Sequence, residues 1–245
     1  MQIDKNRFLD ALATAAYQVS AEKLLLTDSF DAPIYPESLV QVVVAQSLVR
    51  ELHCSRIELE FPTEQIELEL CGGKDCRVCA RQGRVDLICW HSGLPLAAIE
   101  VKDQLAGSDD GLVVDAIRLQ QLLSVQHRLL QRFCLSFGGL VAYVGKNSQR
   151  YKEYKPFDHQ LEPKAKQSIQ TIKRNIEAVI DKTRFDISFR DGRCIDSSRD
   201  ITKPDLYINT EFEDPLSGEE QMTKYLVAVI SRKDPAGPAT ASDEV

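Results

Sequence analysis

The stretch that decides the fold of this chain is Gly83-Arg84-Val85-Asp86-Leu87-Ile88-Cys89-Trp90, followed after a short turn by Ala97-Ala98-Ile99-Glu100-Val101-Lys102. Two apolar runs flanking a Gly-containing turn at residues 91–95 predict a β-hairpin. Residues 87–90 and 97–99 are apolar at every position, so both faces of each strand are apolar. Such runs are typical of central strands that are buried on both sides.

The hairpin brings two carboxylates together. If His91 pairs with Pro95 across a three-residue loop, Asp86 lies opposite Glu100. Side chains alternate between the faces of a strand, so Glu100 and Lys102 share a face. Opposed carboxylates would repel and destabilise the sheet unless a divalent cation lay between them. The pattern therefore predicts a metal site with a lysine beside it, although Glu-x-Lys on a strand is also common on a solvated face.

This pattern resembles the PD-(D/E)xK nuclease superfamily, which includes type II restriction enzymes and Holliday-junction resolvases. The motif here is Val85-Asp86, thirteen residues, then Glu100-Val101-Lys102, with valine in place of the usual proline. The resemblance covers residues 36–145. It implies an α/β (α+β) fold with a restriction-endonuclease-like αβββαβ core, in which helices flank a mixed sheet.

The resemblance also implies roles for individual residues. Asp86, Glu100 and the carbonyl of Val101 would bind Mg²⁺ or Mn²⁺, and Lys102 would orient the attacking water. Glu37, at the start of the first core helix, is the candidate third carboxylate; Glu51, near the other end of that helix, is the alternative.

A glutamine on the helix after the catalytic strands is a further candidate for the site. Gln121 is preferred there to Gln120, which points elsewhere. Asp115 and Arg118 open the same helix three residues apart, and a local ion pair explains them without a catalytic role.

The remaining chain is predicted to form helices and strands around this core. Helices are expected at residues 4–26, 36–53, 115–133 and 163–182, and strands at 56–61, 65–70, 140–144, 185–189 and 225–231. The last strand is expected to extend an edge of the sheet, and Asp191-Gly192 to form a turn. The predicted organisation is an N-terminal helical extension (1–35), the nuclease core (36–145), a basic helix with a late strand (146–233) and a disordered tail (234–245).

Composition limits the class of protein. A net charge of −7 over 245 residues argues against a chain that coats nucleic acid indiscriminately, because phosphate binding needs clustered Lys and Arg. No apolar run is long enough to span a membrane, and the N-terminus has no signal-peptide pattern. We therefore expect a cytoplasmic protein without a membrane partner.

Three cysteines with ligand-like spacing lie in a Gly-containing loop: Cys71, Cys76 and Cys79. They suit most of a tetrahedral structural Zn²⁺ site, with Cys54, His53 or Cys89 as the fourth ligand. The alternative is a set of reduced thiols in a reducing cytosol.

A basic helix supplies the candidate nucleic-acid contacts, which are Lys164, Lys166, Lys173 and Arg174. A run of charges on a helix is also often only its solvated face.

Together these features predict a Mg²⁺-dependent endodeoxyribonuclease that hydrolyses phosphodiester bonds in DNA. By analogy with the superfamily, it would act as a homodimer or as the nuclease of a bacterial defence or mobile-element system. Two alternatives stay open: a non-catalytic module that binds nucleic acid or protein on a nuclease-like scaffold, and a zinc-binding adaptor.

Overall fold

The protein is described by a computed structural model, which covers residues 3–27, 37–65, 83–91, 93–105, 110–127, 132–133, 135–148, 158–194 and 220–233. Its helices are α1 (Lys5–Thr27), α2 (Glu37–Leu52), α4 (Asp110–Leu123) and α5 (Asp158–Val179). Its strands are β1 (Arg56–Pro62), β2 (Arg84–His91), β3 (Leu94–Leu105), β4 (Gln126–His127), β5 (Arg132–Phe133), β6 (Phe137–Ser148), β7 (Phe185–Arg193) and β8 (Glu220–Arg232).

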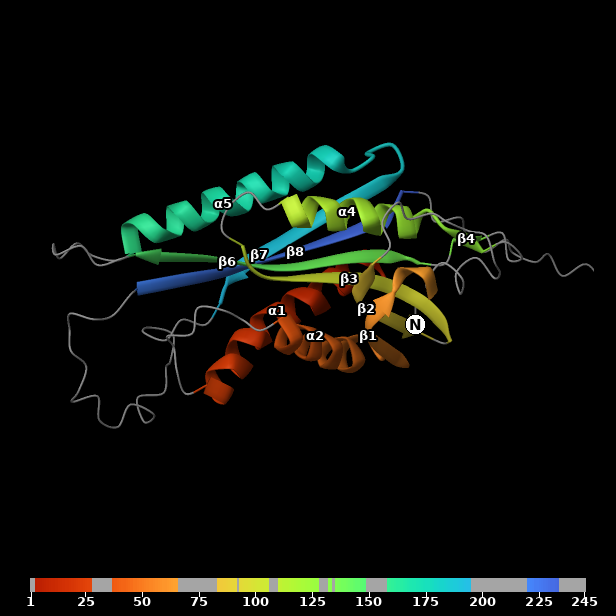
Figure 1. The fold of residues 1–245 in the computed structure, drawn as a ribbon, viewed down its shortest axis with the longest axis horizontal. Helices are drawn as coiled ribbons and strands as arrows, with labels where there is room; N and C mark the ends of the chain where they lie inside the picture. The colour runs from red at the N-terminus through yellow and green to blue at the C-terminus, as the bar shows by residue number, and fades with distance from the viewer. Residues whose placement is uncertain are drawn as a thin grey trace, which may run out of the picture.

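Six strands form one mixed sheet in the order β1-β2-β3-β6-β8-β7. Strands β3 and β6 run parallel, and every other neighbouring pair is antiparallel. A parallel pair needs a crossover connection, and α4 lies in the segment that joins β3 to β6. The predicted mixed sheet flanked by helices is confirmed: α4 and α5 cover one face, and α1 and α2 cover the other (Figure 1).

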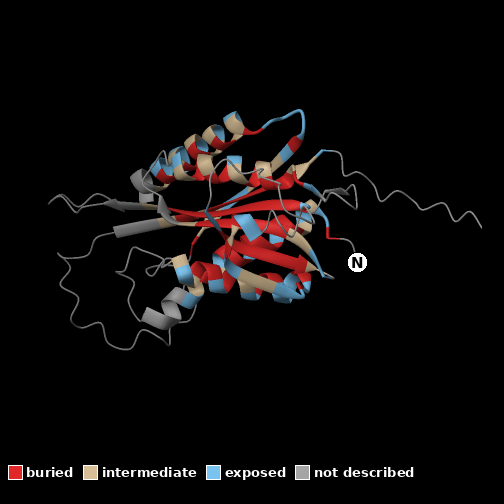
Figure 2. Ribbon diagram, turned by 45° about the vertical axis from the view of Figure 1, so that its right-hand side comes forward, coloured by how far each residue is buried: buried red, intermediate tan, exposed pale blue. Residues whose placement is uncertain are grey.

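The sheet separates two apolar cores, and its central strands are buried on both faces (Figure 2). Ile88 and Ala98 face α4, whereas Cys89 and Ile99 face α1 and α2. This alternation explains why residues 87–90 and 97–99 are apolar at every position.

Two glycines at the start of β6 let helices approach the sheet from both sides. A Cβ on Gly138 would lie 3.0 Å from Cβ of Leu119 on α4, and one on Gly139 would lie 2.9 Å from Cδ1 of Leu12 on α1. The N-terminal helix is thus packed directly on the sheet: the hydroxyl of Tyr143 also donates to the Ala16 carbonyl at 3.0 Å. Among the described helices, none is long and apolar enough to cross a membrane.

The hairpin has a different turn from the predicted one, yet the same register at the motif. His91 pairs with Leu94, so the loop has two residues instead of three, and Gly93 adopts a φ of 76° within it. A bulge between Cys89 and Trp90 shifts the register by one residue, so that Leu87 pairs with Ile99. Continued by one residue, that register brings Asp86 and Glu100 opposite each other, as predicted.

Other predicted elements need correction. Strand β8 lies between β6 and β7, so it is internal and β7 forms the edge. It pairs with β6 over twelve residues. The position of this strand late in the chain gave no indication of that pairing. Strand β7 runs through Asp191 and Gly192, where a turn was predicted, because both pair with β8.

The third predicted helix is also wrong in its bounds. Helix α4 begins at Asp110 and ends at Leu123, and Gln126–His127 and Arg132–Phe133 pair as short strands. The predicted tail at 234–245 lies outside the described residues. So does the predicted strand at 65–70 except for Gln65, which is helical together with residues 63 and 64.

Candidate functional site

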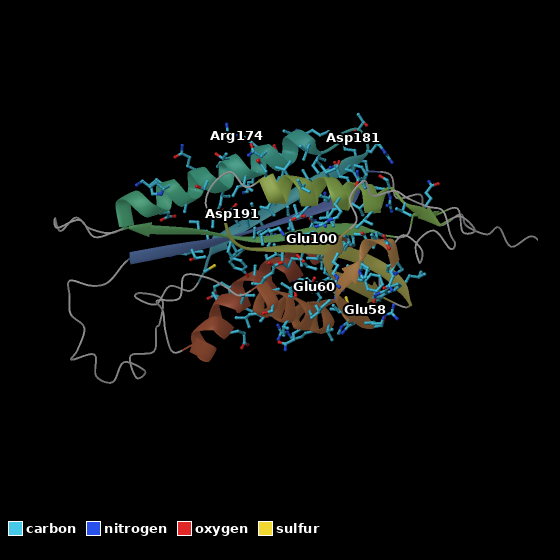
Figure 3. All side chains as sticks on the ribbon, in the orientation of Figure 1. Glu58, Glu60, Glu100, Arg174, Asp181 and Asp191 are labelled. Atoms are coloured by element: carbon cyan, nitrogen blue, oxygen red, sulfur yellow. The ribbon has the colours of Figure 1, made fainter. Side chains whose placement is uncertain are left out.

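The three motif side chains come from two adjacent strands and gather beneath α4. Asp86 lies on β2, and Glu100 and Lys102 lie on β3, on the face that α4 covers. Oδ2 of Asp86 accepts a hydrogen bond from the backbone N–H of Val101 at 2.6 Å, which fixes the Asp86 carboxylate against β3. Figure 3 shows Glu100 at the level of the sheet, below α4. Asp86 is 7% exposed and Glu100 only 1%.

Helix α4 contributes two charged residues that complete a buried network. Oδ2 of Asp115 lies 3.3 Å from Nζ of Lys102. Oδ1 of Asp115 accepts a hydrogen bond from Nη2 of Arg118 at 2.6 Å, and the same Nη2 lies 2.7 Å from Oε1 of Glu100. The predicted Asp115–Arg118 pair exists, but it is buried and links both motif residues of β3 instead of standing alone on a helix.

A β-bulge follows the lysine. Lys102 pairs with Ala142 of β6, but Gln104 pairs with Tyr143, so one residue of β3 is left over between them. Bulges bend a strand and redirect its side chains. This one lies directly after Lys102, and β3 continues to pair with β6 beyond it.

The environment shifts the pKa values of the three motif residues. Burial raises the pKa of the Glu100 carboxyl to about 9, and Arg118 offsets only part of that effect. Burial also raises the pKa of Asp86, although the Val101 N–H and Lys102 oppose the shift. For Lys102, burial alone would lower the pKa, but Asp115, Asp86 and Glu37 together raise it.

The network fits a cation because its carboxylates outnumber its basic groups when all are ionised. Asp86, Glu100 and Asp115 face only Lys102 and Arg118, and Glu37 and Glu60 lie close enough to add negative charge. Oε1 of Glu100 is buried and accepts no hydrogen bond among the described residues. A bound proton, or a divalent cation on Asp86 and Glu100, would supply the missing charge.

A full protein cage for a metal is not present in the described part of the chain. No group of three or more His, Cys, Asp or Glu side chains is placed there to hold an ion. Mg²⁺, however, is commonly bound through one or two carboxylates, with water and substrate phosphates as the other ligands. The pair Asp86 and Glu100 fits that mode, and the carbonyl of Val101 stays a predicted ligand.

Of the two candidate third carboxylates, Glu37 is the better placed. It lies in the first turn of α2 and is close enough to raise the pKa of Lys102. Glu51 lies fourteen residues further along the same helix, about 21 Å away along its axis. Its carboxylate pairs with Arg50 at 3.2 Å. The geometry thus favours Glu37.

Glu60 is an acidic neighbour that the sequence pattern did not single out. It falls opposite Asp86 in the β1–β2 register, at the one position between Arg56 and Pro62 where no pair forms. Its φ is 52°, and its charge contributes to the raised pKa of Asp86. Its Oε1 accepts a hydrogen bond from Gln41 of α2 at 2.7 Å. In the sequence it looks like an ordinary outward-facing residue of an alternating strand.

The two glutamines of α4 behave differently. Gln120 is buried and ties α4 to the end of α5, since its Nε2 donates to the Val179 carbonyl at 3.1 Å and its Oε1 accepts from the Asp181 N–H at 2.9 Å. Gln121 is half-buried, and its side chain makes no hydrogen bond with another described residue. Its predicted place in the site stays a prediction.

The predicted zinc ligands Cys71, Cys76 and Cys79 lie outside the described residues. Two of the three candidates for the fourth ligand contact each other instead: Sγ of Cys54 lies 3.6 Å from Sγ of Cys89, and both thiols are buried. The zinc site therefore stays a prediction.

The four predicted nucleic-acid contacts all lie on α5, on the same side of the sheet as α4 (Figure 1). Lys164 and Arg174 are exposed. Nζ of Lys166 pairs with Glu162 at 2.8 Å, and Lys173 pairs with Asp191 of β7. Two of the four side chains are thus already engaged with carboxylates.

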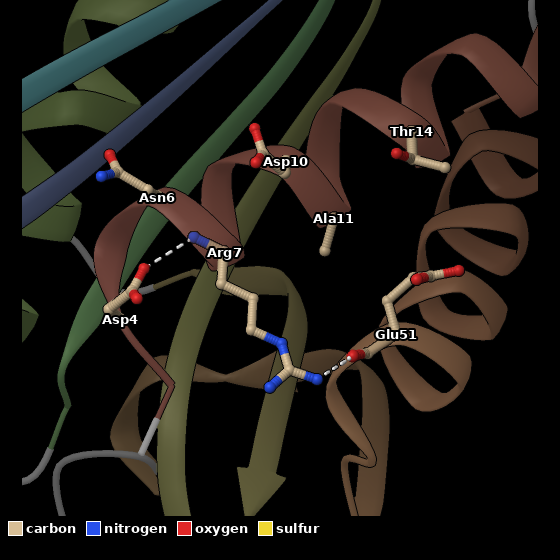
Figure 4. A pocket seen from close by; sticks show the side chains of 7 residues that line it. All are labelled: Asp4, Asn6, Arg7, Asp10, Ala11, Thr14 and Glu51. Carbon is tan, nitrogen blue, oxygen red and sulfur yellow. Dashed lines mark hydrogen bonds between the residues drawn. The ribbon is translucent and has the colours of Figure 1, made fainter. Parts of the chain in front are cut away.

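A separate hollow lies at the start of α1, away from this network (Figure 4). It is lined by Asp4, Asn6, Arg7, Asp10, Ala11, Thr14 and Glu51. Arg7 crosses it, with its Nη2 donating to the Glu51 carbonyl at 2.8 Å, while its backbone N–H donates to Asp4. Arg7 thus links the start of α1 to the end of α2 across the hollow, which contains none of the motif residues.

Comparison with protein-family models, curated proteins and solved structures finds no match for this chain.

Proposed function

We propose that this protein is a Mg²⁺-dependent nuclease that hydrolyses phosphodiester bonds in DNA, with its active site at Asp86, Glu100 and Lys102. One observation carries the proposal: two carboxylates and a lysine converge from adjacent strands in a buried network whose carboxylates outnumber its basic groups. A cation on Asp86 and Glu100 would offset that excess, because an uncompensated buried charge is costly.

The fold supports the same proposal. Elements α2, β1, β2, β3, α4 and β6 occur in the αβββαβ order that the resemblance implies, with the short strands β4 and β5, which form a separate sheet, between α4 and β6. The motif residues lie on the second and third strands of that run, beneath its second helix.

In this mechanism Asp86 and Glu100 would hold the cation, with Val101 and Glu37 as further candidate ligands. When bound, the cation would polarise the scissile phosphate and lower the pKa of a coordinated water. Lys102 orients the attacking water and offsets the negative charge that develops on the phosphate. Asp115 holds the ammonium of Lys102 in place through their 3.3 Å contact. The Val101 N–H keeps the Asp86 carboxylate in one orientation.

The direct test is cleavage of supercoiled plasmid and of single-stranded DNA in Mg²⁺, Mn²⁺ or EDTA. We expect cutting with either metal, none in EDTA, and a loss of at least about 100-fold in Glu100→Ala. Glu51→Ala is the matched control, because it removes a glutamate at the far end of α2 and should leave the rate unchanged.

Lys102→Ala separates the enzyme from its main rival. Loss of cleavage with DNA binding retained supports the nuclease. If the wild type binds DNA but cuts neither substrate with any metal, the non-catalytic binding module replaces the nuclease as the better explanation. We further propose, by analogy alone, that the enzyme acts as a dimer or within a bacterial defence or mobile-element system.

A further inference from the structure

Arg118 contacts two carboxylates with the same nitrogen atom, but the two contacts differ in kind. Nη2 donates a hydrogen bond to Oδ1 of Asp115 at 2.6 Å. It also lies 2.7 Å from Oε1 of Glu100, but that oxygen accepts no hydrogen bond from any described residue. The contact with Asp115 is a hydrogen bond, whereas the contact with Glu100 is a close approach without hydrogen-bond geometry.

The two carboxylates also differ in where they are attached. Asp115 lies three residues from Arg118 on α4, so the pair moves with the helix. Glu100 belongs to β3 and is a proposed ligand of the cation. The guanidinium is therefore anchored to its own helix and covers a side chain that a cation needs.

We infer that Arg118 is a resident counter-ion of the metal site, which pairs with Glu100 when no divalent cation is bound and releases it when one binds. Asp115 keeps hold of the guanidinium in both states. This inference rests on the proposed function, since it requires a cation on Asp86 and Glu100. In this role Arg118 lowers the affinity of the site for a cation, and it links Glu100 to Asp115 when no cation is bound.

Arg118 and the cation therefore compete for Glu100, and the affinity of the protein for the metal measures that competition. Removing Arg118 frees Glu100 but also removes a positive charge near the site, and the second effect alone would favour a cation. Lys102→Met provides the matched control, because Lys102 also carries one charge near Glu100 but pairs with Asp115 and not with Glu100. Any excess gain in Arg118→Met over Lys102→Met measures the competition for Glu100.

The experiment is titration calorimetry of the full chain with Mn²⁺ at one pH and salt concentration. We expect Arg118→Met to bind Mn²⁺ about tenfold more tightly than Lys102→Met does, because a contact with a charged group no longer has to be broken. Equal affinities in the two variants, or weaker binding in Arg118→Met, would overturn the inference.

Two further variants keep the result interpretable. If Arg118→Met does not fold, Arg118→Lys retains the charge but loses the guanidinium whose Nη2 reaches both carboxylates, and it should still bind Mn²⁺ more tightly than the wild type. Glu100→Gln tests the proposed function separately. If Glu100→Gln leaves Mn²⁺ affinity unchanged, the ion is elsewhere and the nuclease site itself is wrong; if it abolishes binding while Arg118→Met and Lys102→Met match, only the role of Arg118 fails.

Discussion

The charges beneath α4 and those along α5 lie on the same side of the sheet, but their surroundings differ. Asp115 and Glu100 are 4% and 1% exposed and share the guanidinium of Arg118. On α5, Lys166 and Glu162 pair at 2.8 Å with side chains that are 62% and 37% exposed. Both regions contain ion pairs at close helical spacing, so spacing alone does not distinguish a functional network from a solvated helix face. The two are distinguished by burial and by a third partner from another element.

Replacing Asp115 should give the largest difference between the two regions. Asp115→Ala leaves Arg118 and Lys102 without the carboxylate that joins them, and breaking a buried pair in this way costs about 3–5 kcal/mol. On α5, Lys166→Ala breaks an exposed i,i+4 pair and should cost about 0.5 kcal/mol or less. Urea unfolding of both variants measures the free energies. Similar losses of unfolding free energy in the two variants would show that the charges beneath α4 do not form a buried network.

The sequence predicted the part of this site that neighbouring residues form, the hairpin, but not the part that depends on contacts between distant segments. The apolar runs on either side of residues 91–95 correctly predicted a hairpin with Asp86 and Glu100 near each other. The predicted loop was one residue too long, and the bulge at Cys89 and Trp90 compensated for that error. A one-residue slip would have turned Asp86 to the other face, so it is this compensation that keeps Asp86 opposite Glu100.

What could not be predicted depends on contacts between distant segments. Asp115 and Arg118 were correctly recognised as a pair, but nothing in their spacing indicates that α4 crosses β3 at Glu100 and Lys102. Strand β8 looked like an added edge because it lies far along the chain, whereas it pairs with β6 in the interior of the sheet. Sheet order is set by which strands bury each other, and a single sequence carries little information on that.

The two regions should also respond to pH in opposite directions. In the metal-free protein, Glu100 has a pKa of about 9, against 4.5 for an ordinary glutamate. The native state therefore binds more protons than the unfolded state between these values, so the free energy of unfolding falls as pH rises from 4.5 to about 9, by up to about 1.4 kcal/mol per pH unit. On α5, hydrogen bonding to Lys166 lowers the pKa of Glu162, so its contribution is present above pH 4.5 and is lost as pH falls through its lowered value.

Urea unfolding of wild type and Glu100→Gln between pH 5.5 and 8.5 isolates the first effect. The difference in unfolding free energy between the two proteins should change with pH in that range, because glutamine cannot ionise. Parallel curves would mean that Glu100 does not hold a proton in the native state. Adding Mn²⁺ to the wild type should reduce the loss at high pH if the cation takes the place of that proton.

The smallest effect is expected on α5 and concerns DNA binding instead of stability. Lys164 and Arg174 are exposed, while Lys166 and Lys173 already pair with Glu162 and Asp191. A side chain that must leave a carboxylate to reach a phosphate gains less from the exchange. Lys164 and Arg174, which form no ion pair with a described residue, should therefore carry most of any phosphate contact. Each lost contact lowers the slope of log affinity against log salt by about 0.9.

Fluorescence anisotropy of labelled DNA over a range of salt should thus give a slope reduced by nearly two in Lys164→Ala/Arg174→Ala. It should change less in Lys166→Ala/Lys173→Ala, which has the same loss of charge. Equal slopes in the two double variants would mean that the ion pairs on α5 open freely, and no change in either would assign the DNA contacts to another surface.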